Sequence, residues 1–233
     1  MRYFILDFES TDKVSTTADI IQASGFLVDE ELNIKEVIND YILPSTPITK
    51  GAEEVHHISN EMIETLSDGY DIIDFVMDNR HILCDSDDIC FITYNAQFDL
   101  TLLMNCYKRA VTRLVDEGAS RSNFPKLNFG NEVRSLRGIN NKTNGNCYFC
   151  LMKGCRDLFR FRNSRNQLSY RKLGYVLDEK TDYNPDSIIQ WLKDFCNRHE
   201  IETRKELDFH NSLYDSFVSL LILTDYFPRF KTL

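Results

Sequence analysis

The opening run of the chain, from Arg2 to Glu9, constrains the fold more than any other segment. Its residues favour a β-strand, and the run ends in two acids one position apart, Asp7 and Glu9. Successive side chains of a strand point to opposite faces, so these two carboxylates emerge on the same side. Repulsion and desolvation oppose that arrangement unless a cation neutralises it. Mg²⁺ or Mn²⁺, hard ions with oxygen ligands, would do so; a strand that simply ends in solvent is the alternative.

A second segment leads from a short strand into a helix. Residues 89–94 favour a strand, a polar turn follows, and residues 100–107 have helical periodicity. Asp99 then lies in the first turn of the helix, where the positive end of the helix dipole favours an anion. Helix capping alone would explain Asp99, so this acid indicates a site only in combination with the others.

A third segment near the end of the sequence adds an imidazole and a fourth carboxylate. Apolar residues between 217 and 226 recur with helical spacing, and Asn211 or Ser212 would cap this helix at its start. Asp215 then lies in the first turn or just beyond it, and His210 lies on the approach to the helix. A ligand fixed on a helix beside a mobile histidine suits metal binding and proton transfer, although a lone loop histidine is usually just solvated.

Taken together, the three motifs resemble the DEDDh branch of the DEDD exonuclease superfamily, which includes proofreading epsilon subunits, RNase T and oligoribonucleases. The matching motifs are D-F-E-S-T at 7–11, N-A-Q-F-D at 95–99 and H-N-S-L-Y-D at 210–215, in the family's order. The last motif departs from the family pattern at Ser212, where alanine is usual. The resemblance implies an α/β, RNase H-like fold with a mixed β-sheet flanked by α-helices, as a single domain over residues 1–233.

The resemblance also implies an activity, which is removal of nucleoside 5′-monophosphates from the 3′ end of single-stranded or frayed nucleic acid. Four carboxylates would hold two Mg²⁺ or Mn²⁺ ions around the scissile phosphate, and a histidine would act as general base on the attacking water. The implied catalytic residues are Asp7, Glu9, Asp99, His210 and Asp215, of which the four acids are the metal ligands. DNA is slightly favoured as substrate, and an RNA-directed exonuclease of the same fold is the alternative.

Contacts to the terminal nucleotide are implied near the first two motifs. Residues 44–59 resemble the family's P-x-x-P-I … V-H-G-I-S segment, which makes His56 a candidate contact. His57 stands where the family usually has glycine, and a helix capped by Ser59 is expected next. Phe98 fits a core position equally well. The candidate substrate contacts are Phe8, Ser10, Thr11, His56 and Phe98.

The remaining segments match the family in part. Further elements are expected as strands at Ile20–Val28 and Val37–Leu43, and as a helix at Leu168–Leu177 that follows a D-T-L-like segment at Asp157–Phe159. Two insertions are expected, at about 118–150 and 178–209, the second with a helix at Pro185–Arg198.

The size and content of the chain set further limits. A chain of 233 residues can bury one substantial core, which fits a single domain. No apolar run reaches the ~18 residues that span a bilayer, and no basic region precedes the first hydrophobic stretch, so neither membrane insertion nor secretion is expected. We therefore expect a cytoplasmic protein, in a bacterial, phage or viral context. Seven cysteines, an odd number, fit a reducing compartment.

Three of the cysteines cluster in the sequence, as Cys147, Cys150 and Cys155. A structural zinc site normally has four ligands, and Cys196 or a distant histidine would have to supply the fourth. A zinc-stabilised interaction protein without hydrolytic activity is therefore one rival function. A non-catalytic module that binds a nucleic-acid end or a polymerase is another.

The net charge of −9 argues against a nonspecific grip on long duplexes. Residues 156–172 are nevertheless basic, with interleaved aromatic rings, a pattern that could track phosphates and stack on bases. A solvated helix face is the alternative. The candidate nucleic-acid contacts are Arg156, Arg160, Arg162 and Arg165. The expected partners are a single-stranded 3′ end and, in addition, a polymerase or a second copy of the chain.

Overall fold

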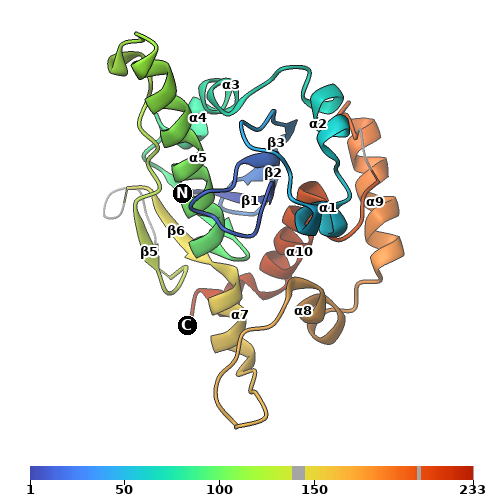
Figure 1. Ribbon diagram of the computed structural model, residues 1–233. Coiled ribbons are helices and arrows are strands. Elements are labelled where there is room, and N and C mark those ends of the chain that lie inside the picture. The colour runs from blue at the N-terminus through green and yellow to red at the C-terminus, as the bar shows by residue number, and fades with distance from the viewer. Residues whose placement is uncertain (138–144, 204–205, 233) are drawn as a thin grey trace.

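A six-stranded β-sheet forms the centre of the computed structural model, which describes residues 1–137, 145–203 and 206–232 (Figure 1). The strands lie in the order β3-β2-β1-β4-β6-β5 across the sheet. Their bounds are β1 Arg2–Ser10, β2 Ile20–Val28, β3 Ile34–Tyr41, β4 Ile89–Thr93, β5 Asn131–Val133 and β6 Cys147–Cys150. Because β1 pairs antiparallel with β2 and parallel with β4, the sheet is mixed, as predicted.

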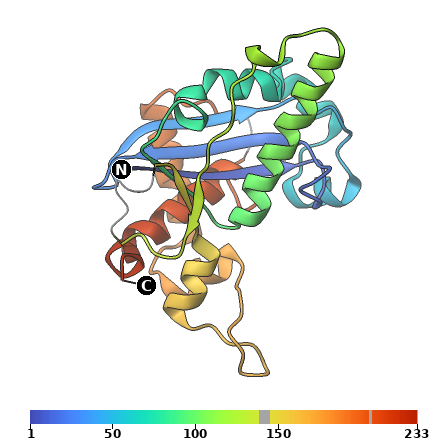
Figure 2. The same ribbon diagram turned by 90° about the vertical axis from the view of Figure 1, so that its left-hand side faces the viewer.

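Helices cover both faces of the sheet (Figures 1 and 2). One face carries α10, which packs on β1 and β2, and the other carries α3 and α5. The helix bounds are α1 Lys50–His56, α2 Asn60–Ser67, α3 Ile72–Asp78, α4 Arg80–Leu83, α5 Ala96–Asp116, α7 Leu151–Phe159, α8 Leu173–Lys180, α9 Pro185–Arg198 and α10 Ser212–Phe230. A 3-10 turn follows α5 at Arg121–Asn123. In the described part of the chain, every helix is too short or too polar to cross a membrane.

Side chains alternate along β1, so neighbouring residues point to opposite faces of the sheet. Tyr3 and Ile5 pack in the core beneath α10, whereas Phe4 packs in the core beneath α3 and α5. Burial of each large apolar side chain contributes about 1.5–3 kcal/mol, so a slip of one residue in this register is strongly disfavoured. The odd-numbered Asp7 and Glu9 therefore emerge on the α10 side of the sheet.

A small third core holds α1 close to the end of β1. Ile48 and Ile58, which flank α1 in the sequence, pack with Ile21 of β2. The N–H of Thr49, the residue that caps α1, donates to the carbonyl oxygen of Thr11 at 2.9 Å. Loop and helix are thereby fixed beside the strand that carries the first two acids.

Several predicted elements are confirmed. β2 and α9 have the predicted bounds, Ser59 caps α2, and Asn211 caps α10. The strand predicted at 37–43 is present but is displaced, to Ile34–Tyr41.

The helix predicted at 168–177 is wrong in its first half. Residues 161–169 form a β-hairpin, in which Ser169 N–H donates to the Phe161 carbonyl and Asn163 N–H donates to the Gln167 carbonyl, both at 2.9 Å. The helix α8 begins only at Leu173. Apolar periodicity along residues 168–177 carries no information on this pairing with a preceding segment.

The stretch predicted as a first insertion contributes two strands to the sheet. β5 and β6 lie within residues 118–150, pair parallel to each other, and join the sheet through the parallel pair of β6 with β4. Residues 138–144 of this stretch, and residues 204–205 of the second predicted insertion, lie outside the described residues.

Candidate active site

Three carboxylates meet where the end of β1 lies beside the start of α10. One ligand oxygen each of Asp7, Glu9 and Asp215 lie within 4.8 Å of one another. Among the residues that the structure describes, no other group of three or more His, Cys, Asp or Glu side chains comes this close together. Segments more than 200 residues apart in the sequence thus supply one acidic cluster.

Hydrogen bonds tie the start of α10 to the strand next to β1. Asn211 Oδ1 accepts from the Leu213 N–H at 3.1 Å, which caps the helix, and from Gln22 Nε2 at 3.4 Å. The hydroxyls of Ser24 and Ser212 lie 2.7 Å apart and share a hydrogen bond. Ser212 is the residue at which the third motif departs from the family pattern, and its hydroxyl has a structural use here. Because β2 pairs directly with β1, these bonds hold the helix against the acid-bearing strand.

Asp99, the fourth predicted ligand, lies in the first turn of α5 and is only 4 % exposed. Its Oδ2 is buried without a hydrogen-bond partner among the described residues, and so is Oδ1 of Asp215. Buried carboxylate oxygens without donors are costly, so each demands an explanation. The charge of Asp99 also acts on Asp7 and Asp215, as expected for a neighbour of the cluster.

Burial and mutual repulsion disfavour the charged forms of these acids. Burial raises the pKa of Asp99 to about 7 and the pKa of Asp215 to about 7. The pKa of Asp7 lies well above its usual range, first because of burial and then because of its acidic neighbours. A divalent cation would offset both effects, and a donor set made only of carboxylate oxygens suits a hard ion. The residues present therefore fit Mg²⁺ or Mn²⁺.

His210 lies immediately before the cap of α10 and is exposed. Its backbone has a positive φ of 67°, and its N–H donates to Asp215 Oδ2 at 3.2 Å. The residue is thus fixed next to the acidic cluster through its main chain, while its side chain is accessible from solvent.

A pocket of about 420 Å³ opens beside the acidic cluster, and Glu9 lines it. Four of the five predicted substrate contacts line this pocket, namely Phe8, Ser10, His56 and Phe98. The sequence motifs do not point to the remaining lining residues, which are Asp12, Lys13, Thr49, Gly51, Ala52 and Val55. Lys13 could have been found as the first cation after the D-F-E-S-T motif; those of α1 depend on long-range packing that no local motif encodes.

Thr11 is the predicted contact that the structure does not bring to the pocket. Its side chain is buried, and its hydroxyl accepts from the Asp19 N–H at 2.9 Å and lies 3.2 Å from the hydroxyl of Thr46. His56 lines the pocket but is only 2 % exposed, with Nδ1 accepting from Ile58 N–H at 3.1 Å. The residue after it, at the family's glycine position, adopts the left-handed conformation that glycine favours, with φ of 58° at the C-cap of α1.

The three clustered thiols do not come together. Cys147 and Cys155 pack in the core beneath α10, whereas Cys150 packs on the other side of the sheet. Cys147 lies opposite Cys90 on the neighbouring strand. Two thiols three positions apart on one strand point to opposite faces, so in the described structure these three thiols do not form the cluster that the zinc alternative requires.

The predicted basic contacts lie at and beyond the end of α7. Arg156 forms an ion pair with Asp157 at 2.6 Å, and Arg160 ends the helix with a positive φ of 56°. Arg162 and Arg165 belong to the hairpin that follows and are exposed. The alternative of a solvated helix face therefore does not describe residues 160–172.

E. coli exonuclease I in complex with a dA16 oligonucleotide superposes with a TM-score of 0.61 at 14 % identity, over 99 % of this chain and 42 % of that one. The apo exonuclease I gives 0.59 at 13 % identity, over 99 % and 43 %, and a product-bound form gives 0.58 at 14 %, over 99 % and 45 %. This chain has the same RNase H-like fold.

The predicted fold class is therefore confirmed. At this identity the likeness concerns the fold alone, and this chain spans about two fifths of the length of exonuclease I. No protein-family model matches the sequence, and no curated protein matches it.

Proposed function

We propose that the protein is a metal-dependent 3′–5′ exonuclease of the DEDDh type that removes mononucleotides from single-stranded or frayed ends. The observation that carries this proposal is the cluster of Asp7, Glu9 and Asp215, with Asp99 buried nearby. Two of these acids, Asp99 and Asp215, each have a carboxylate oxygen that finds no donor among the described residues. Buried carboxylates that lie close together destabilise the folded state when no cation is present. Stability of the fold therefore does not explain this cluster. The adjoining pocket supplies room for a terminal nucleotide.

The four acids would hold the metal ions, two in the DEDDh scheme. When bound, Mg²⁺ or Mn²⁺ supplies the positive charge that activates water at neutral pH and offsets charge developing on the phosphate. The protein's own part is to fix those acids, through the β1 register and through the hydrogen bonds between β2 and α10.

His210 is the proposed general base. His210 is exposed, and its main-chain N–H donates to a carboxylate oxygen of Asp215. An accessible imidazole next to the metal ligands can take a proton from the attacking water and pass it to solvent. The side chain needs no deep burial for this role.

The pocket is the proposed seat of the 3′-terminal nucleoside. Phe8 and Phe98 offer apolar surface to a sugar or base, and Lys13 offers a cation to a phosphate. Single-stranded DNA is the proposed substrate, because the exonuclease I structures with this fold hold DNA oligonucleotides. An exoribonuclease remains the alternative. Action in the cytoplasm and association with a polymerase or a second copy stay predictions.

One substitution pair tests this proposal. Asp215→Ala should reduce Mg²⁺-dependent cleavage of a single-stranded oligonucleotide by at least about 10³-fold, because an acidic ligand is lost. Asp225→Ala on the same helix is the matched control and should leave cleavage within severalfold. Within the described part of the chain, Asp225 accepts one hydrogen bond, from the Tyr183 hydroxyl at 3.0 Å, and does not belong to the acidic cluster. Asp215→Ala with near-normal cleavage would refute the assignment.

A further inference from the structure

Residues 160–172 form a basic arm, the segment with the highest density of positive charge in an otherwise acidic protein. Five cations and no acid occupy these thirteen positions, against a net charge of −9 for the whole chain. The cations of the arm are Arg160, Arg162, Arg165, Arg171 and Lys172. Such a local excess against the overall charge indicates an anionic partner.

The arm is an ordered hairpin that projects from the end of α7. Asn163 organises its tip, because its Oδ1 accepts from the N–H groups of Arg165 and Gln167 at 2.9 and 3.0 Å. Arg171 donates from its guanidinium to the Arg162 carbonyl at 2.8 Å and so closes the base of the hairpin. The cations are therefore presented from a fixed backbone, which lowers the entropy cost of binding.

In the described structure, the cations of the arm form no ion pairs with acidic side chains of the protein. Within the described chain, the ion pairs of Arg and Lys involve residues outside the arm, such as Arg156 with Asp157 at 2.6 Å. Arg160, Arg165 and Lys172 are exposed as well. Their charges are available to an external ligand.

Exposed aromatic rings accompany the charges. Tyr170 and Tyr175 are 46 % and 43 % exposed, so part of each ring is accessible to a ligand. The guanidinium of Arg156 lies 5.0 Å from the centre of the first ring, and that of Arg171 lies 5.1 Å from the centre of the second. Rings and guanidinium planes in alternation suit unstacked bases and phosphates, a combination that an acidic peptide or a lipid surface does not need.

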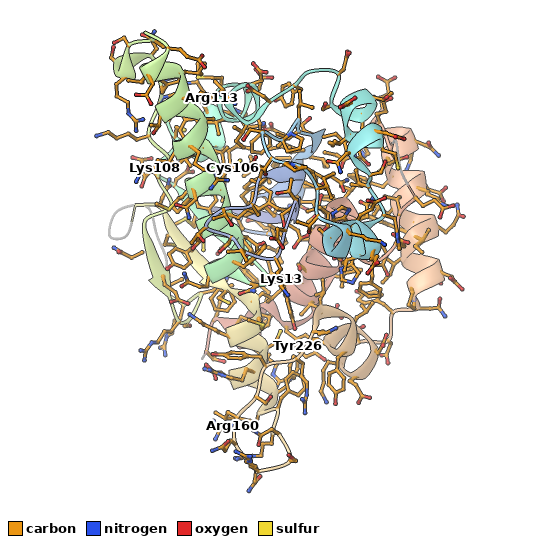
Figure 3. All side chains as sticks on the ribbon, in the orientation of Figure 1. Lys13, Cys106, Lys108, Arg113, Arg160 and Tyr226 are labelled. Atoms are coloured by element: carbon orange, nitrogen blue, oxygen red, sulfur yellow. The ribbon has the colours of Figure 1, made fainter. Side chains whose placement is uncertain are left out.

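The arm is anchored to the helix that carries Asp215. Phe159 at its base stacks edge-on against Tyr226 of α10, with ring centres 4.8 Å apart, and Phe161 is buried in the core beneath α10. Figures 1 and 2 show the arm leaving the body of the molecule below the sheet. In Figure 3, Lys13 at the pocket, Tyr226 and Arg160 follow one another from the middle of the molecule to its lower end.

We propose that the basic arm binds single-stranded nucleic acid, contacting the phosphates and bases of the strand upstream of the 3′ end. That the end of this strand occupies the pocket rests on the proposed function, whereas strand binding by the arm does not. The arm then supplies the enzyme with positive contacts to the phosphates of longer substrates. The rest of this acidic protein is less suited to make such contacts.

The test measures binding without hydrolysis. Every protein carries Asp7→Ala and is kept in chelator, and its affinity for a 5′-fluorescein-labelled dT25 is measured by anisotropy at several salt concentrations. The arm variant is Arg160→Gln, Arg165→Gln and Lys172→Gln, three exposed cations whose side chains form no ion pair or hydrogen bond within the described structure. The matched control is Lys108→Gln, Arg113→Gln and Arg121→Gln, three exposed cations on and after α5, two of them labelled in Figure 3.

Both variants remove three positive charges, so any difference between them reports position rather than net charge. The arm variant should bind at least about 10-fold more weakly at 0.1 M salt and lose about 2 from the slope of log affinity against log salt, whereas the control stays within twofold of the parent. Tyr170→Ala should weaken binding about 5-fold or more, through lost stacking. Thermal melting verifies that each variant is folded.

The results separate this proposal from the proposed function. Equal losses in the arm and control variants, or no loss in either, would overturn the arm as a strand-binding element. If the arm variant loses affinity for poly-glutamate but not for dT25, the partner is an acidic protein instead. Arm-dependent DNA binding by a protein that never hydrolyses DNA in Mg²⁺ would retain the arm and reject the exonuclease.

Discussion

At the scale of single residues, the site is a collection of groups that are unfavourable without a ligand. Asp99 and Asp215 are each left with a buried oxygen that accepts no hydrogen bond in the described structure. Their pKa values, both raised to about 7 by burial, express the same cost as a preference for the neutral acid. Groups that oppose folding in this way are typical of functional sites.

Asp99→Asn should therefore stabilise the metal-free protein while it abolishes cleavage. The folded-state pKa of Asp99 lies above its ordinary value, so the folded protein holds this proton more tightly than the unfolded chain. The contribution of this proton to the free energy of unfolding is fully present below pH about 4. It is lost as the pH rises through about 7, where Asp99 ionises in the folded protein. Asparagine cannot ionise, and we expect a gain of about 1–3 kcal/mol at pH 8 in chelator, vanishing near pH 4. Urea unfolding at both pH values measures it, and a variant less stable than wild type at pH 8 would contradict the account.

His210→Ala should slow cleavage by about 10² to 10⁴ while the protein still binds metal, because only the base is lost. Activity should partly recover at high pH, where hydroxide replaces the imidazole. His81→Ala is the control, since His81 is an exposed histidine paired with Glu36 at 3.0 Å on another part of the surface. A pH–rate profile of His210→Ala parallel to that of wild type would argue against the general-base role.

The acids could be predicted from the sequence because strand alternation and first-turn positions are local rules. The path of the chain after Glu9 could not. The register between β1 and β2 shifts between Glu9 and Ser10, and this irregularity turns Thr11 inward toward Asp19. A motif match gives no warning of such a bulge.

At the scale of elements, the start of α10 is the joint on which the site depends. The sequence predicts both the helix and its cap. The sequence alone gives no sign that Asn211 and Ser212 also bind β2, because their partners Gln22 and Ser24 are nearly 190 positions away. Their buried side chains convert a helix cap into a strand–helix link.

Asn211→Ala should lower both stability and activity. Loss of the cap and of the contacts to Gln22 costs about 1–3 kcal/mol, and displacement of the first turn of α10 should reduce cleavage at least about 10-fold. Asn184→Ala is the matched control, because Asn184 caps α9 in the same way, through bonds from Asp186 and Ser187 N–H. Among the described residues its side chain makes only these capping hydrogen bonds, and α9 carries none of the proposed catalytic acids. This control should cost about 1 kcal/mol and leave the rate unchanged. Equal rate losses in both variants would mean that stability alone governs activity.

The helix predicted from residue 168 onward is wrong over residues 168–172 because a local signal misleads the prediction. Helical periodicity there is a local signal, and the pairing of Arg162 with Leu168 overrides it. The bridge between Arg162 and Leu168 is short-range, whereas the pairing of β6 with β4 joins distant segments and is decided by tertiary context.

At the scale of the whole molecule, one sheet and its two flanking layers of helices bring together motifs that are distant in the sequence. They meet where β1 ends and α10 begins. The order of strands and helices along the sequence predicts the α/β class. The sequence does not predict that the segment 118–150 supplies two further strands, because short strands in polar surroundings carry little pattern. The molecule as a whole is acidic, with the site's own carboxylates adding to that charge and the basic arm standing apart from it.

The measurement that tests the central claim most directly is cleavage of 5′-labelled single-stranded DNA and RNA oligonucleotides in Mg²⁺, in Mn²⁺ and in chelator. Wild type should give a ladder that shortens from the 3′ end only when a divalent ion is present, faster on DNA, and Asp7→Ala should give none. A ladder that persists in chelator or in Asp7→Ala, or no ladder on either substrate, would contradict the assignment of these acids to a catalytic metal site.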